Sequence, residues 1–102
     1  SGVDLRGGKG DPVFAMASGR VVIAEGMYYE GNFIAIDHGS GIFSLYMHLD
    51  GLAVEEGRTV RAGELIGHVG STGLSTAAHL HVSVTIDGVY VDPISLMYAV
   101  PR

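Results

Sequence analysis

Two period-two runs joined by a glycine-rich turn constrain the fold of this chain more than any other feature. The runs are Asn32 to His38 and Ile42 to Leu49, and Asp37-His38-Gly39-Ser40-Gly41 links them. Side chains two apart in a strand share a face, so each run can bury one face of a sheet. The pattern predicts an antiparallel β-hairpin.

Short β-prone runs continue on both sides of this hairpin. They span residues 13–15, 20–24, 64–69, 79–87 and 89–91, and Asp87-Gly88 is a turn signal between the last two. Asp92-Pro93 then predicts a short helical tail through Met97, with Asp92 as the cap. The expected fold is all-β, with antiparallel sheets forming a small β-sandwich or half-open barrel.

A weak internal repeat adds to this expectation. Gly10-Asp11-Pro12-Val13-Phe14-Ala15 resembles Gly57-Arg58-Thr59-Val60-Arg61-Ala62. An apolar run beginning with glycine follows each copy, at Gly19 and at Gly63. Two copies of a small β unit, packed face to face, would bury a surface that neither buries alone.

Composition excludes several classes of function. The length of 102 residues suits one domain. The chain has only six Lys and Arg and a net charge of −5, which argues against nucleic-acid binding. No apolar run reaches the roughly 20 residues that span a membrane. Cysteine is absent, which removes disulfides and thiolate chemistry. Because the chain opens abruptly at Ser1, we expect a fragment of a longer precursor.

The run from Ile42 to Leu49 presents two faces of different polarity. Phe43, Leu45, Met47 and Leu49 form a wholly apolar set, which we expect to face the core. Ile42, Ser44, Tyr46 and His48 form the more polar set. This arrangement leaves His48 either as an exposed histidine or as an acid–base group over a cleft.

Three other residues are candidates for metal or proton chemistry, and two further histidines are not. His79 and His81 flank Leu80 and share one face of a strand, so they can supply a metal ligand and an acid–base group. Asp4 lies in a glycine-rich stretch and is by itself an ordinary loop aspartate. His38 in the turn and His68 in a strand are interpreted as structural.

Taken in order along the chain, these segments resemble the lysostaphin-type zinc metallopeptidases, or LytM domains. The matching segments are Ser1-Gly2-Val3-Asp4-Leu5, Gly10 to Ala15, Ile36-Asp37-His38-Gly39, Leu45-Tyr46-Met47-His48-Leu49, Gly63 to Gly67, Ser71-Thr72-Gly73 and Ala78-His79-Leu80-His81-Val82, and Asp92-Pro93 also fits. The resemblance covers essentially the whole chain as a single domain.

The resemblance implies a zinc endopeptidase that cuts peptide bonds in peptidoglycan. Asp4 and His81 match metal ligands, and His48 and His79 match the histidines that hold the attacking water and stabilise developing charge. The family's first ligand is a histidine four positions before the aspartate, which falls immediately before Ser1. The chain as it stands is therefore expected to bind Zn²⁺ weakly. Ala77-Ala78 replaces a frequent Gly-Pro, which should change only loop rigidity.

The same resemblance implies a groove over one sheet, with Asp4, His48, His79 and His81 at its floor. The segments 27–30 and 71–78 should form its walls, and Tyr28 and Tyr29 either stack against the substrate or pack within the protein. The expected partner is a peptidoglycan peptide. The expected location is extracytoplasmic, and the expected state is a monomer.

Two alternatives remain open. Some relatives lose metal residues and instead bind and activate wall amidases, although Asp4, His48, His79 and His81 are all retained here. The segment 54–64 also resembles biotinyl and lipoyl carrier modules, but Lys9, the single lysine, is misplaced for cofactor attachment. Phosphocarriers with paired histidines share a similar double β unit.

Overall fold

The computed structural model describes residues 3–5, 9–70 and 80–91, and all of their regular structure is β. The nine strands are β1 (Val3–Leu5), β2 (Pro12–Phe14), β3 (Gly19–Met27), β4 (Gly31–Gly39), β5 (Ile42–Leu52), β6 (Thr59–Val60), β7 (Leu65–Val69), β8 (Leu80–Ile86) and β9 (Val89–Val91). None of the described ranges contains a helix long and apolar enough to cross a membrane.

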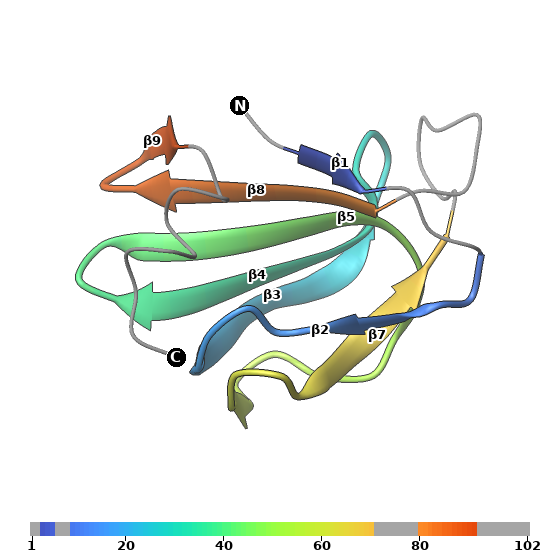
Figure 1. The fold of residues 1–102 in the computed structure, drawn as a ribbon, viewed down its shortest axis with the longest axis horizontal. Coiled ribbons are helices and arrows are strands. Elements are labelled where there is room, and N and C mark those ends of the chain that lie inside the picture. The colour runs from blue at the N-terminus through green and yellow to red at the C-terminus, as the bar shows by residue number, and fades with distance from the viewer. Residues whose placement is uncertain (1–2, 6–8, 71–79, 92–102) are drawn as a thin grey trace.

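All pairings are antiparallel, and the strands form one curled sheet (Figure 1). Its main path is β1-β8-β5-β4-β3-β6, with β9 beside β8 and β2 beside β7. The long strand β5 turns the sheet: residues 42–47 pair with β8, whereas residues 49–52 pair with β7. The sheet therefore folds over itself as a half-barrel, and β2 and β7 cover one of its faces.

The core lies between the two layers of this half-barrel. Aliphatic side chains from β3, β4 and β5 meet those of β2, β6 and β7 there. The fully buried members include Val21, Ile34, Ile36, Val60 and Ile66. A core this small is consistent with a chain of 102 residues.

The two copies of the repeat are related by an exchange of strands. β2 from the first copy pairs with β7 from the second, and β6 from the second pairs with β3 from the first. The Gly10 N–H donates to the Val69 carbonyl, and the Gly57 N–H donates to the Val21 carbonyl, both at 2.7 Å. Each valine N–H returns a hydrogen bond to the residue after that glycine, at 2.8 and 2.9 Å.

This symmetry corrects the repeat alignment drawn from sequence. Val21 is equivalent to Val69, so the partner of Gly19 is Gly67 and not Gly63. A Cβ on Gly19 would overlap the carbonyl oxygen of Asp37, and one on Gly67 would overlap that of Gly51. The equivalent glycines are therefore those where two strands approach closely, a constraint that a sequence pattern does not display.

The prediction of an all-β half-barrel is confirmed, and the predicted hairpin is β4–β5. Its turn is shorter than expected, because β4 continues through His38 to Gly39. The strands β1 and β6 were not predicted, since each is very short and is formed by pairing with a distant strand. The predicted helical tail from Asp92 lies outside the described residues.

Candidate metal and catalytic centre

Three strands bring residues from opposite ends of the chain into one row. Asp4 on β1 lies directly opposite His81 on β8, and His81 lies directly opposite Met47 on β5. Directly opposed residues of antiparallel strands have Cα atoms about 4.5–5.5 Å apart. The sheet therefore places the two predicted metal ligands, Asp4 and His81, at neighbouring positions. His48 follows Met47, the residue of β5 that lies opposite His81.

His48 interrupts the regular alternation of β5. It is one of three non-glycine residues with positive φ among those described, at 60°. The register shifts here, so that two residues of β5, Met47 and His48, oppose the single residue Phe33 of β4. This is a β-bulge, which inserts one residue and re-aims the side chains beside it.

The predicted faces of β5 were wrong before the bulge and right for Leu49 after it. Ser44 and Tyr46 are buried and face the core, whereas Phe43, Leu45 and Met47 on the other face are half-buried. Leu49 also faces the core, although it is three residues from Tyr46. Met47 and His48 therefore both lie on the outer face. His48 is on the same side of the sheet as His81 and on the opposite side from Tyr46.

A buried hydrogen-bond chain allows polar side chains to occupy the core face. His38 Nδ1 donates to the Ser18 carbonyl at 2.7 Å, and His38 Nε2 lies 2.7 Å from Ser44 Oγ. Ser44 Oγ lies 2.9 Å from the Tyr46 hydroxyl, which accepts the Met16 N–H at 3.0 Å. Burial raises the pKa of Tyr46, while the Ser44 and Met16 hydrogen bonds lower it by less.

These contacts account for two histidines that sequence analysis interpreted as structural. Both ring nitrogens of His38 are used within the chain, on β4 rather than in a turn. His68 lies in β7 as expected, opposite Pro12 on one side and Gly51 on the other. Neither pairing brings these residues into the row of Asp4 and His81.

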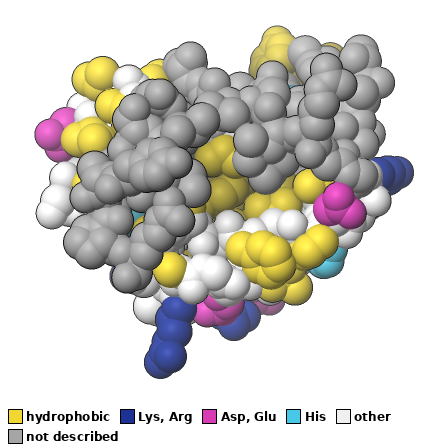
Figure 2. All heavy atoms as spheres, in the orientation of Figure 1, with side chains coloured by type: hydrophobic (Ala, Val, Ile, Leu, Met, Phe, Trp, Pro, Cys, Tyr) yellow, Lys and Arg dark blue, Asp and Glu magenta, His cyan; other side chains and the backbone are white. Residues whose placement is uncertain are grey.

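The outer face of the sheet is apolar beneath this row. Phe33 and Ala35 of β4 are buried there, and Ser83 of β8 is buried opposite Leu45. Figure 2 shows hydrophobic side chains between the grey regions near the centre of the view. Other atoms of the chain cover these side chains, since they are buried in the chain alone.

The β3–β4 turn approaches His48 from one end of the sheet. The main-chain N–H of His48 donates to the Glu30 carbonyl at 2.6 Å. The turn carries Tyr28 and Tyr29, which are 75% and 66% exposed and contact each other edge to face with ring centroids 4.9 Å apart. These rings do not pack into the core, which leaves them open to a ligand.

The structure describes three of the four predicted site residues. Asp4 and His81 are placed by strand pairing, and His48 is placed with its side chain half-buried. His79 and the segment 71–78 lie outside the described residues. No three His, Cys, Asp or Glu side chains gather as a metal site within the described part of the chain.

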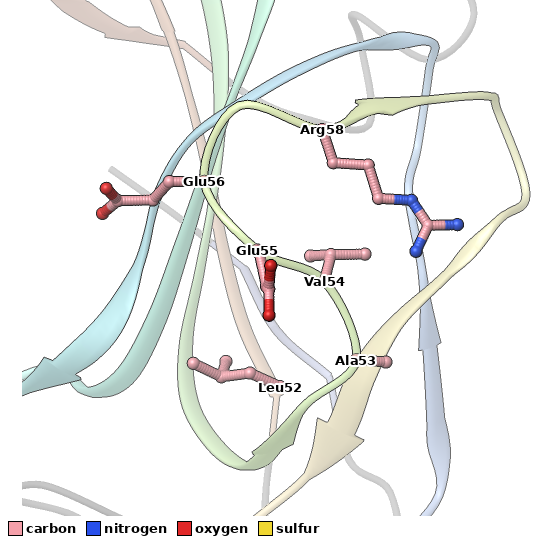
Figure 3. Close-up of a pocket in the computed structure, with 6 residues that line it drawn as sticks. All are labelled: Leu52, Ala53, Val54, Glu55, Glu56 and Arg58. Atoms are coloured by element: carbon pink, nitrogen blue, oxygen red, sulfur yellow. The ribbon is translucent and has the colours of Figure 1, made fainter.

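A surface pocket lies elsewhere, in the β5–β6 connection (Figure 3). Its lining consists of Leu52, Ala53, Val54, Glu55, Glu56 and Arg58. Arg58 forms an ion pair with Glu64 at 2.6 Å, and Glu56 accepts the Ala24 N–H at 3.3 Å. These charged groups connect strands within the chain, and none of them is a predicted site residue.

The model of peptidase family M23 matches residues 1–93. This chain belongs to peptidase family M23. Among M23 relatives, the DD-carboxypeptidase/endopeptidase Mpg of Neisseria meningitidis is 41% identical over 102 residues, which are 100% of this chain and 24% of that protein. The murein hydrolase activator NlpD of Escherichia coli is 39% identical over 94 residues, 91% of this chain and 24% of that protein. This M23 chain thus spans about a quarter of the length of these relatives.

Solved structures confirm the predicted resemblance to lysostaphin-type peptidases. The catalytic domain of lysostaphin from Staphylococcus simulans matches this M23 domain with a TM-score of 0.87 and 38% identity, over 95% of this chain and 77% of that one. A zinc-containing peptidase from Vibrio cholerae matches with a TM-score of 0.86 and 34% identity, over 88% of this chain and 28% of that one.

Proposed function

We propose that this M23 domain is a zinc-dependent endopeptidase that hydrolyses peptide bonds in bacterial peptidoglycan. The observation that carries the proposal is the row formed by Asp4, His81 and Met47, with His48 beside it. Asp4, which has a carboxylate, and His81, which has an imidazole, are neighbours across β1 and β8. Family membership and the zinc-containing structural relative support the same reaction.

The donor set fits zinc. Zn²⁺ is bound in proteins by carboxylate oxygen and imidazole nitrogen, and a catalytic site typically has three protein ligands and one open position. Asp4 and His81 would supply two of these ligands. We propose that the third is a histidine immediately before Ser1, where the family pattern has one. When bound, zinc supplies a Lewis acid that polarises the scissile carbonyl and acidifies a water molecule.

The histidines next to the metal would carry the proton chemistry. A neutral imidazole accepts a proton from the attacking water, and a second donor stabilises the developing oxyanion or protonates the leaving amine. We assign these two tasks to His48 and His79 without dividing them. His48 suits either task, because the bulge presents it on the outer face, one residue from the position opposite His81.

The substrate would lie as an extended peptide along the outer face of the sheet. The exposed tyrosines of the β3–β4 turn, which lies beside His48, support this assignment. Tyrosine combines a large apolar ring with a polar hydroxyl and is favoured at binding surfaces. We therefore propose that Tyr28 and Tyr29 form part of the groove wall.

Peptidoglycan lies outside the cytoplasm, so the domain would act in an extracytoplasmic compartment. The 102 residues would be the catalytic domain of a longer protein, because the relatives continue well beyond the matched segment. We propose that the domain itself works as a monomer.

A second candidate function follows from the relative named murein hydrolase activator. In that case the outer face would bind another hydrolase and would not cut peptide bonds. The retention of Asp4, His48, His79 and His81 favours the enzyme, since an activator has no need for metal and proton-transfer residues.

Zinc content and hydrolysis test the two functions together. The 102-residue chain and a chain extended upstream by a few native residues are each measured for zinc by elemental analysis and incubated with purified peptidoglycan. We expect about one zinc per extended chain, much less in the short chain, and new peptide termini that a chelator prevents. Absence of zinc from both chains, or zinc without new termini, would reject the endopeptidase and favour the activator.

A further inference from the structure

The β3–β4 turn and the β5 bulge are joined by one main-chain hydrogen bond. The Glu30 carbonyl accepts the His48 N–H at 2.6 Å, and His48 has φ of 60°. A left-handed conformation is unfavourable for a residue with a Cβ, because the Cβ lies too close to the following carbonyl oxygen. Such a conformation persists only where the surrounding structure holds it.

The left-handed conformation decides which face of the sheet receives the imidazole. With regular alternation, residue 48 would lie on the core face with Ser44 and Tyr46. With the bulge, it lies on the outer face with Met47, whose partner is His81. The backbone at residue 48, and not only its side chain, is therefore part of the candidate centre.

Gly31 controls the direction of the Glu30 carbonyl. The Glu30 carbonyl and the Gly31 N–H belong to one peptide group. The φ angle of Gly31 therefore sets the direction of the Glu30 carbonyl relative to β4. Gly31 is buried with φ of 70° and lies opposite Met27 at the base of the turn. Glycine adopts this left-handed conformation without the steric cost that a Cβ would add.

We propose that Gly31 is a positioning residue for His48. Its left-handed conformation aims the Glu30 carbonyl at the His48 amide and so holds the bulge that presents the imidazole on the outer face. The kinetic part of this inference rests on the proposed peptidase function. The structural part, the coupling of the turn to the bulge, does not.

Three variants of the upstream-extended chain separate positioning from general stability. Gly31→Ala introduces a residue that disfavours φ of 70°, whereas Gly31→Asn introduces one that tolerates it. Gly57→Ala is the control for backbone cost alone, because Gly57 has φ of 91° and an added Cβ would contact nothing within 4 Å. Gly31→Asn also adds a Cβ, so it is the control for the space around buried residue 31. The alanine variants carry a similar backbone cost, but only Gly31 adjoins the residue that contacts His48.

With a soluble cross-linked muropeptide, we expect Gly31→Ala to lower kcat by about 10- to 100-fold through misplacement of His48. Its zinc content should stay within about two-fold of wild type, since Asp4 and His81 lie on other strands, and kcat should fall by a larger factor than KM rises. Gly31→Asn should recover most of kcat, and Gly57→Ala should retain it. Equal kcat in both alanine variants would overturn the proposal.

Hydrogen exchange of the His48 amide gives a readout that needs no catalysis. In the wild type, this amide should exchange as slowly as the amides of the β4–β5 ladder, and faster exchange would overturn the proposal even if Gly31→Ala does not fold. In folded Gly31→Ala the amide should lose protection by about ten-fold or more, a difference of 1.4 kcal/mol. If the wild type shows this protection but no hydrolysis, the positioning inference holds and the peptidase function fails.

Discussion

At the scale of single residues, the candidate centre is made of residues that lie far apart in the sequence and become neighbours only in the folded sheet. Asp4 and His81 are 77 positions apart (81 − 4), yet strand pairing makes them direct neighbours. His48 joins them through a conformation that is uncommon for a residue with a Cβ. Substitutions at these positions should therefore separate metal binding from proton transfer.

In the extended chain, we expect His81→Ala to lose most of its zinc, because one of three protein ligands is removed. His48→Ala and His79→Ala should keep the fold and the zinc but lose at least about 10²-fold in kcat, the typical size of a general acid–base contribution. Elemental analysis and muropeptide cleavage measure the two effects. Full zinc content in His81→Ala would remove this residue from the ligand set.

A second residue-scale prediction concerns the buried chain that ends at Tyr46. Tyr46→Phe removes the acceptor of the Met16 N–H and a partner of Ser44. Leaving buried polar groups unpaired should lower the free energy of unfolding by about 1–3 kcal/mol. Urea denaturation at neutral pH measures this loss. Tyr90→Phe is the control, since Tyr90 is 50% exposed, and an equal loss there would contradict the interpretation.

At the scale of elements, turns and close strand contacts determine what the sheet can present. The β3–β4 turn combines the exposed tyrosines with the Glu30 carbonyl that contacts His48. One short element thus lies beside both the proposed substrate path and the proposed acid–base residue. Its two contributions should have different kinetic signatures.

We expect the double change Tyr28→Ala and Tyr29→Ala to raise KM by about 5- to 30-fold, or about 1–2 kcal/mol, with little change in kcat. The rings would contact the substrate equally in the ground state and the transition state, so their loss should weaken binding only. Steady-state kinetics on a muropeptide provides the measurement. Tyr90→Ala removes an exposed tyrosine from β9 and should leave KM unchanged.

The close approach of β5 and β7 gives a second element-scale prediction. A Cβ at Gly67 would overlap the Gly51 carbonyl oxygen, whereas a Cβ at Gly51 would meet only His68 Nδ1 at 3.8 Å. Gly67→Ala should therefore lower the free energy of unfolding by about 1–3 kcal/mol, as overpacking does. Gly51→Ala should change it by less than about 0.5 kcal/mol. Chemical denaturation of the two variants would refute this account if their stabilities were equal.

At the scale of the whole molecule, burial of a titratable hydroxyl links stability to alkaline pH. The pKa of Tyr46 is raised above its ordinary value of 10.0, chiefly by burial. The unfolded chain therefore releases this proton at lower pH than the folded chain does. The contribution of this pKa difference to the free energy of unfolding is fully present below about pH 10. It is lost as the pH rises through the pKa of Tyr46 in the folded chain.

We expect the unfolding midpoint in urea to fall as the pH rises above about 10 in the wild type, and to fall less steeply in Tyr46→Phe. The comparison cancels the titration of other groups, because both chains carry them. Parallel declines in the two proteins would show that Tyr46 does not contribute this pH dependence.

Sequence alone determined the fold class and most of its elements. Period-two runs and glycine turns are local signals, so they located β2, β3, β4, β5, β7, β8 and β9 to within a few residues. The family resemblance is likewise a property of ordered motifs, and the match to residues 1–93 confirms it. The assignment of Asp4, His48, His79 and His81 to their roles stays a prediction.

Tertiary structure decided which faces and neighbours these elements have. Polarity predicted that Ser44 and Tyr46 face outward, but hydrogen bonds to distant residues satisfy their hydroxyls and allow burial. The bulge at His48 depends on the turn at Gly31 and on the register with β4. The strand β1 forms only by pairing with β8, at the far end of the sequence. Each of these features is set by contacts between residues far apart in sequence, which local patterns do not encode.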